Sequence, residues 1–343
     1  MTLLAVPTIV LWIICTVSHA AVIDMQLRYL LSALVILLLL SFLHLALGPS
    51  SFGFAHLGDN SNVILLDLRL PRALLAMLNG AALGMAGAVL QVVFRNPLAE
   101  PGITGIAGGS ALAVVLVLYT GVLLPVNWLL PLVGMLGGFL SLLLLWAIVG
   151  RYTDNLRLIL AGVAVAAFAA ALLALVLNLA PNPFAYLEWS LWLLGSVANR
   201  GWEQVYLLFP AVVIGALLIA SQQRYLSAHI FDAATLATLG FRQRWALWWL
   251  LLAITLLISA SVVTAGVIGF IGLLAPHLAR LLGEHRPPQL VAYSALSGAA
   301  LLLLIDSLVK VIPTPVEMQL GVIAAFVGAP WLIVLLWRQQ VRV

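Results

Sequence analysis

The sequence predicts an all-α polytopic membrane protein with about ten transmembrane helices. Apolar residues occupy 64% of its 343 positions and charged residues only 8%, whereas soluble domains usually have about 45–50% apolar and about 25% charged residues. The mean hydropathy is +1.20, and the apolar residues gather in runs near the length of about 20 residues that crosses a bilayer core. Little of the chain therefore remains for a soluble domain.

Ten apolar runs are interpreted as membrane spans, at 28–47, 72–94, 104–120, 128–149, 157–179, 202–220, 244–263, 267–282, 289–309 and 316–338. The first 24 residues are also apolar. They are either an eleventh membrane segment or the result of a start upstream of the true one at Met25. We therefore divide the chain into an apolar extension, 1–24, and one membrane domain, 25–343.

The charges between the runs orient the spans. If the first span begins in the cytoplasm, all but four of the fifteen Lys and Arg residues fall on the cytoplasmic side. Because positive charge favours that side, this topology is the expected one, and it places the C-terminus in the cytoplasm. The four exceptions, which are candidates for function, are Arg69, Arg72, Arg200 and Lys310.

Several kinds of chemistry are excluded by what the sequence lacks. The only lysine, Lys310, follows Ser-Leu-Val, so no GxxxxGK[ST] phosphate loop exists. The single cysteine, Cys15, excludes a disulfide framework and a CxxC metal site. The basic residues are scattered rather than clustered, which argues against nucleic-acid binding. We expect no catalytic residue, no metal site and no cofactor bound by this chain.

The distribution of acidic residues bears on the energy source. They are expected in loops or within about a turn of the predicted span ends, whereas ion-coupled transporters usually bury ionisable groups near the bilayer centre. This weakens the hypothesis of an ion-coupled secondary transporter, although a sodium site built from carbonyl groups would escape the test.

Two polar segments interrupt the apolar pattern. In "FRNPLAEPGITGIAGGSAL", residues 94–112, Pro97 and Pro101 prevent a continuous helix, and the glycines allow close packing as the chain re-enters the membrane. The passage 221–243 is the longest polar segment on the cytoplasmic side, and within it Asp232 and Gly240 are placed to cap a short helix over 233–239.

A third polar motif, "TPVE" at 314–317, matches a capping box with Thr314 as N-cap and Glu317 at the third helical position. We interpret Glu317 as a structural residue rather than a ligand-binding one.

Five motifs then appear in an order that resembles the FecCD-like permeases. They are "RLPRALLAMLNGAALGMAGAVLQVVFRNPLAEPGITGIAGGSALA" (69–113), "RLILAGVA" (157–164), "WLLGSVANRGWE" (192–203), "GVIGFIGLLAPHLARLL" (266–282) and "GVIAAFVGAPWLIVLLW" (321–337). These permeases are the membrane subunits of ATP-driven importers for ferric siderophores, haem and cobalamin. The resemblance covers about 28–338 and implies a type II ABC importer permease fold.

The resemblance implies three groups of functional residues. Those implied to form the pathway wall and its gate are Asn96, Pro97, Pro101, Gly102, Asn155 and Leu156, although the last two also fit an ordinary helix-entry turn. Those implied to couple the permease to an ATPase are Asp232, Thr235, Leu236, Leu239 and Gly240. Those implied to receive acidic residues of a binding protein are Arg69, Arg72 and Lys310; interfacial snorkelling of these cations is the alternative.

The function implied is that of a permease subunit in a binding-protein-dependent ABC importer, which moves an iron chelate (ferric siderophore or haem) across the bacterial inner membrane. Cobalamin is the alternative substrate. The implied partners are cytoplasmic subunits that bind ATP and Mg, a second permease copy or homologue, a periplasmic substrate-binding protein and membrane lipid.

Overall fold

The computed structural model describes residues 31–47, 63–121, 129–150, 155–312, 314 and 317–340. The extension 1–24 lies outside these residues. Within them the chain is built of helices and their connections, and each of the ten predicted spans contains a helix.

Within the described residues, six helices are long and apolar enough to cross a membrane. They are η2 and α3, which run on from one another (Ile64–Arg69 and Leu70–Val93), α5 (Leu129–Val149), α6 (Asn155–Asn178), α8 (Trp202–Ser221), α11 (Gln243–Ala265) and α13 (Pro287–Val311). The shorter apolar helices are Leu31–Ala46, α4 (Ile106–Thr120) and α12 (Ile271–Leu281), and α14 (Leu320–Gln340) contains a shorter apolar stretch over Leu320–Val334. Four small helices complete the described chain: η3 (Pro101–Thr104), α7 (Pro183–Leu193), α9 (Gln223–Ala228) and α10 (Ala233–Thr238).

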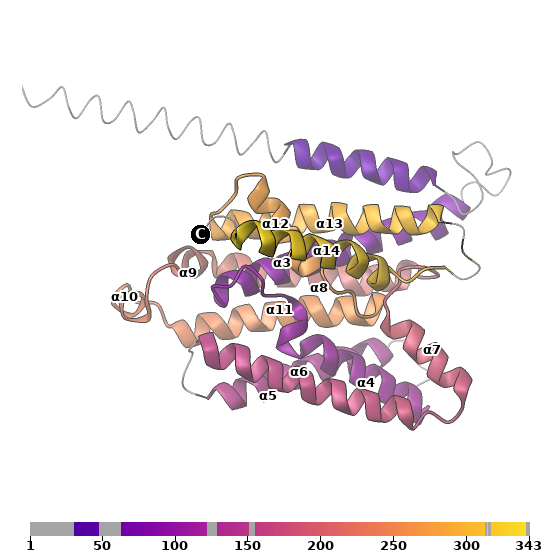
Figure 1. Cartoon of the computed structure of the whole chain (residues 1–343), viewed down its shortest axis with the longest axis horizontal. Coiled ribbons are helices and arrows are strands. Elements are labelled where there is room, and N and C mark those ends of the chain that lie inside the picture. The colour runs from indigo at the N-terminus through magenta and orange to yellow at the C-terminus, as the bar shows by residue number, and fades with distance from the viewer. Residues whose placement is uncertain are drawn as a thin grey trace, which may run out of the picture.

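The long helices form one bundle with two distinct ends (Figure 1). Helices α9 and α10 lie at one end, here named the α10 end, and α7 lies at the other, here named the α7 end. Helices α3 and α11 occupy the centre, with 78% and 72% of their apolar windows buried, whereas the corresponding share of α6 is only 28%. Helix α6 therefore presents most of its apolar surface outward, as expected for contact with lipid or another subunit.

Small residues set the closest helix contacts. A Cβ atom added to Gly80 of α3 would collide with the backbone of Gly298 in α13, and one added to Gly87 would collide with Gly272 in α12. Close backbone approach of this kind is typical of membrane helices, since lipid provides no hydrophobic drive for association. The glycine-rich face of "GAALGMAGA" is thus the contact surface of α3.

One predicted span is much shorter than expected. The run 267–282 was expected to be a span, but α12 has only 11 residues and rises about 16 Å. The chain before it is not helical, because Gly266 and Phe270 have φ angles of 74° and 65°. Residues 266–270 are non-helical and are buried or half-buried within the protein, and non-helical chain is tolerated at membrane depth where protein covers it.

Three of the four small helices, η3, α7 and α9, were not predicted. Helix α7 begins at Pro183, and the side chain of Asn182 caps it by accepting a 2.9 Å hydrogen bond from the Ala185 amide. An Asn-Pro pair is a recognisable helix-start signal. Helix α9, by contrast, has no side-chain cap.

Candidate functional sites

The α7 end holds a buried ionic cluster centred on Asp306 of α13. The guanidinium of Arg72 donates two hydrogen bonds of 2.8 Å to it, from Nε to Oδ2 and from Nη2 to Oδ1. His44 Nε2 lies 2.7 Å from the same Oδ2. Such bidentate pairing between a guanidinium and a carboxylate is among the strongest polar contacts in proteins, and Asp306 itself is fully buried.

The cluster extends outward through three further residues. Lys310 Nζ lies 3.2 Å from His44 Nδ1, so Nδ1 accepts and Nε2 carries the proton that is donated to Asp306. Arg72 also pairs with Glu317, and Arg69 Nη1 donates to the Leu45 carbonyl at 2.7 Å. We name the following six residues the basic cluster: His44, Arg69, Arg72, Asp306, Lys310 and Glu317. Three cations face two carboxylates, which leaves one positive charge in excess.

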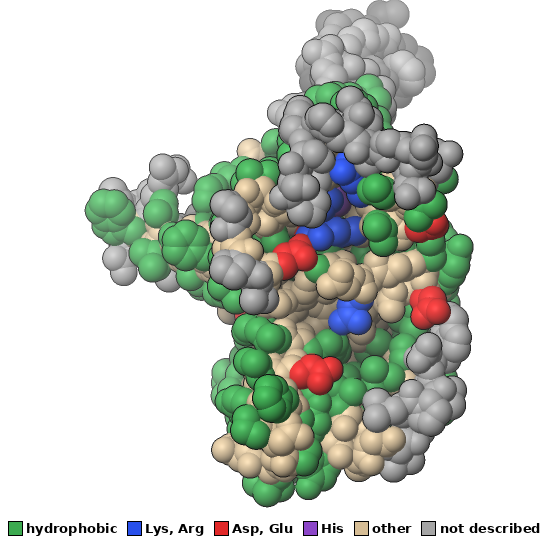
Figure 2. Space-filling view, turned by 90° about the vertical axis from the view of Figure 1, so that its right-hand side faces the viewer, with side chains coloured by type: hydrophobic (Ala, Val, Ile, Leu, Met, Phe, Trp, Pro, Cys, Tyr) green, Lys and Arg blue, Asp and Glu red, His purple; other side chains and the backbone are tan. Residues whose placement is uncertain are grey.

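Figure 2 looks onto the α7 end and shows several basic side chains gathered in one place, a further basic side chain apart from them, and acidic side chains at separate points. The three basic residues predicted to receive a partner are therefore together, but they are not free. Arg69 is only 8% exposed, and the Arg72 side chain only 14%. The most exposed charged side chain paired in the cluster is Glu317, at 38%.

The structure adds to one expectation about acidic residues and contradicts another. Asp306 lies near the end of α13, as expected of an acidic residue, but its carboxylate is buried among helices. Glu317 was expected inside the first turn of a helix, whereas α14 begins only at Leu320. Glu317 is structural in another way, because it neutralises Arg72. The cations expected on the non-cytoplasmic side of the membrane were the signal in the sequence that acidic partners would lie near them.

At the α10 end the predicted short helix is confirmed. Asp232 Oδ1 accepts a 3.2 Å hydrogen bond from the Thr235 amide, and the hydrogen bonds from Thr235 lower the pKa of Asp232. Gly240 has a φ of 82°, and the Phe241 amide donates to the Leu236 carbonyl at 3.1 Å. The helix is thus capped at both ends by local sequence, as expected.

The two leucines predicted to contact an ATPase point in different directions. Leu236 is 2% exposed and belongs to the hydrophobic core, whereas Leu239 is 56% exposed. Two more large apolar side chains precede the helix and are also exposed, Ile230 and Phe231. The outward apolar surface of this segment is therefore formed by Ile230, Phe231 and Leu239.

The segment after α3 turns and re-enters the bundle. Asn96 Oδ1 accepts from the Leu98 amide at 2.9 Å, Pro97 is exposed in the turn, and buried Pro101 opens η3. Pro101 and Gly102 line a cavity of about 120 Å³ together with Glu100, Ser261 and Phe270.

Helix η3 packs on α6, where a Cβ atom added to Gly162 would press on the Ile103 carbonyl. The predicted gate residues, Asn155 and Leu156, lie in the first turn of α6, and Leu156 is 62% exposed.

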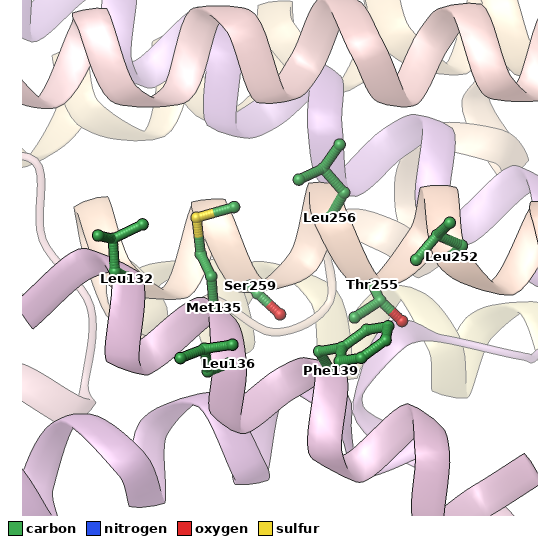
Figure 3. A pocket seen from close by; sticks show the side chains of 8 residues that line it. All are labelled: Leu132, Met135, Leu136, Phe139, Leu252, Thr255, Leu256 and Ser259. Carbon is green, nitrogen blue, oxygen red and sulfur yellow. The ribbon is translucent and has the colours of Figure 1, made fainter.

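A second cavity of about 250 Å³ lies between α5 and α11 (Figure 3). Its lining is apolar except for the hydroxyl groups of Thr255 and Ser259, and Thr255 Oγ1 donates to the Leu251 carbonyl at 2.8 Å. Since no charged side chain lines it, this cavity has none of the features of a chemical site.

Comparison with known proteins agrees with this architecture. The hemin transport permease HmuU of Yersinia pestis is 36% identical over 336 residues, which cover 92% of this chain and 97% of HmuU. The vitamin B12 import permease BtuC of Vibrio parahaemolyticus is 34% identical over 315 residues, covering 90% and 94%. A solved structure, described as an inward-facing conformation of a metal-chelate-type ABC transporter, is 28% identical with a TM-score of 0.82, covering 91% and 99%.

The model of the FecCD transport family matches residues 29–338. This match takes in every helix that forms the two ends described above. The chain therefore belongs to the FecCD transport family.

Proposed function

We propose that this chain is the permease subunit of a binding-protein-dependent, ATP-driven importer in a bacterial inner membrane, with the α10 end in the cytoplasm. Family membership over nearly the whole chain supports this proposal. The strongest structural support is the outward apolar surface of the α10 segment, because an ordered, doubly capped helix with such a surface is expected to contact a partner. The proposed partner is a cytoplasmic ATP-binding subunit, which binds the ATP and Mg in this proposal.

The α7 end is the proposed docking surface for a soluble periplasmic binding protein. Its excess positive charge would attract acidic side chains and orient the encounter. Because Arg72 and Lys310 are already paired within the cluster, the attraction comes from the net charge rather than from free cations. A second copy of the permease, or a homologue, is the proposed occupant of the outward apolar surface that includes α6.

The proposed substrate is an iron chelate, either a ferric siderophore or haem. Haem is the cargo named for one relative, and a metal chelate for the solved structure. Cobalamin is the second candidate, because a cobalamin permease is nearly as similar, at 34% identity over 315 residues.

Uptake into liposomes tests this proposal. The permease, its ATP-binding subunit and its binding protein are reconstituted with ATP inside, and labelled haem, ferric hydroxamate and cobalamin are supplied outside in turn. We expect accumulation of one iron chelate only, and no accumulation with a non-hydrolysable nucleotide. Accumulation of cobalamin alone would show that cobalamin, and not an iron chelate, is the substrate. Accumulation of none of the three compounds would contradict the proposal.

A further inference from the structure

An arginine ends α3 at a position that normally belongs to glycine. The Arg95 amide donates to the Val92 carbonyl and the Asn96 amide to the Gln91 carbonyl, both at 3.1 Å, which is the Schellman pattern. Arg95 accordingly has a φ of 50°, in the left-handed region. Glycine adopts this conformation without a steric penalty, so a larger residue persists there when its surroundings hold it.

The side chain of Arg95 bonds the connection between α9 and α10. Its Nη2 donates to the His229 carbonyl at 2.8 Å and also to the Phe231 carbonyl. In return His229 Nε2 lies 3.1 Å from the Val93 carbonyl, to which it donates, and His229 is only 7% exposed. Hydrogen bonds from both sides therefore fasten the segment that leads into α10 to the last turn of α3.

The same turn of α3 is fastened to the interior of the bundle. Gln91 Nε2 lies 3.3 Å from the Ala99 carbonyl and 3.5 Å from the Leu273 carbonyl of α12. Pro101 then packs against Gly272, so a Cβ atom at that glycine would collide with the proline ring. A displacement of the connection between α9 and α10 would thus reach both the 94–105 segment and α12.

We propose that Arg95 is a positioning residue that transmits movement of α10 to the wall of the transport pathway. In this proposal the wall is formed by α3, the 94–105 segment and α12. The inference rests on the proposed function, in which α10 contacts the ATP-binding subunit. It explains why arginine occupies a glycine position: the backbone strain is tolerated because the side chain supplies the connection.

Replacement of Arg95 by glycine separates a coupling role from a structural one. Glycine suits the left-handed conformation, so thermal stability and co-purification with the ATP-binding subunit should be unchanged or improved. ATP hydrolysis should continue, while substrate transported per ATP falls by about fivefold or more. Arg95→Lys retains a donor and should be intermediate. Arg242→Gln, which removes an exposed cation at the same end, is the matched control and should behave as wild type.

The proposal is overturned if Arg95→Gly transports with the wild-type ratio of substrate to ATP. It is also overturned if this variant unfolds or loses its ATP-binding subunit, because Arg95 would then be a structural support only. The wild-type complex is measured first. If it shows no ATP-driven uptake, the proposed function is overturned, and this inference is overturned with it.

Discussion

Asp306 is the residue on which the basic cluster depends. Its carboxylate accepts from Arg72 and His44 while fully buried. Replacement by alanine leaves Arg72 with Glu317 as its remaining partner in the cluster, and breaking a buried pair in this way costs about 3–5 kcal/mol. We expect Asp306→Ala to lower the free energy of unfolding in detergent by an amount of this order.

Glu317 provides the matched control for Asp306. Its side chain is 38% exposed, and exposed ion pairs contribute about 1 kcal/mol or less. Glu317→Gln should therefore barely change the unfolding transition. Equal losses for the two variants would show that burial does not set the strength of this cluster.

Glu317→Gln also tests docking at the α7 end. The substitution removes one of two carboxylates and raises the excess positive charge of the basic cluster. If an acidic binding protein docks here, its association should become faster at low ionic strength, and the gain should disappear at high salt because of screening. Surface plasmon resonance on the reconstituted permease measures this rate. A slower association, or one insensitive to salt, would place the docking surface elsewhere.

His229 gives the connection before α10 a pH dependence. Burial lowers the pKa of His229, and nearby Arg95 lowers it further, although the bond to Val93 opposes them. Burial also raises the pKa of the adjacent Tyr225 to about 12, so that phenol stays neutral. A histidine with a lowered pKa stabilises the fold above its unfolded pKa of about 6.5, and this stability is lost as the pH falls through the folded value.

We therefore expect hydrogen exchange in residues 225–240 to become faster as the pH falls from about 7.5 to about 5.5, after correction for the intrinsic rate. His229→Gln keeps a donor for Val93 but does not titrate, and should remove this dependence. An identical pH profile for the two proteins would exclude His229 as its source.

Residue contacts of this kind are only partly visible in the sequence. The cations at 69, 72 and 310 stood out because they oppose the charge rule, and the structure does bring them together. Their partner Asp306 was missed, since nothing local shows that a carboxylate is buried against a helix more than 200 positions away. The pairing depends on the packing of α3 against α13 at Gly80 and Gly298.

At the scale of single elements, two leucine substitutions in and beside α10 test whether its exposed apolar surface contacts the ATP-binding subunit. Leu239→Asp places a charge on the exposed apolar surface, so the permease should fold normally but lose its ATP-binding subunit on co-purification. Leu236→Asp buries a charge in the core and should destabilise the permease itself. Loss of co-purification by Leu239→Asp without loss of thermal stability is the expected result.

Two outcomes would contradict that account of α10. Normal co-purification of Leu239→Asp would show that this surface is not the contact. A loss of stability equal to that of Leu236→Asp would show that Leu239 is part of the core.

Elements defined by local chemistry were predictable and those defined by packing were not. The ends of α10 follow from Asp232 and Gly240, whose roles need only a few neighbouring residues. The start of α12 depends on the left-handed conformation of Phe270, a residue type that gives no local signal for it. The start of α14 at Leu320 likewise follows from tertiary contacts, since the Leu320 and Gly321 amides donate to carbonyls of Gly195 and Leu194.

At the scale of the whole molecule, composition was sufficient to predict an all-helical membrane protein and the positions of ten apolar helices. It was not sufficient to predict their depth or burial. Helix α6 has the highest mean hydropathy of the three, 2.7 against 1.8 for α3 and 2.3 for α11, yet α6 lies at the surface of the bundle while α3 and α11 lie at its centre. The central helices also bring polar side chains together, since the buried Thr264 hydroxyl of α11 donates to Asn79 Oδ1 of α3 at 3.4 Å.

The central claim is that this permease transports only when a partner hydrolyses ATP, and energy dependence tests it most directly. Uptake of the labelled iron chelate is measured in liposomes holding either the permease alone or the complete complex, under a proton gradient, a sodium gradient or internal ATP. We predict accumulation only by the complete complex with ATP, and none by the permease alone under either gradient. Accumulation by the permease alone, driven by a proton or sodium gradient, would contradict the account.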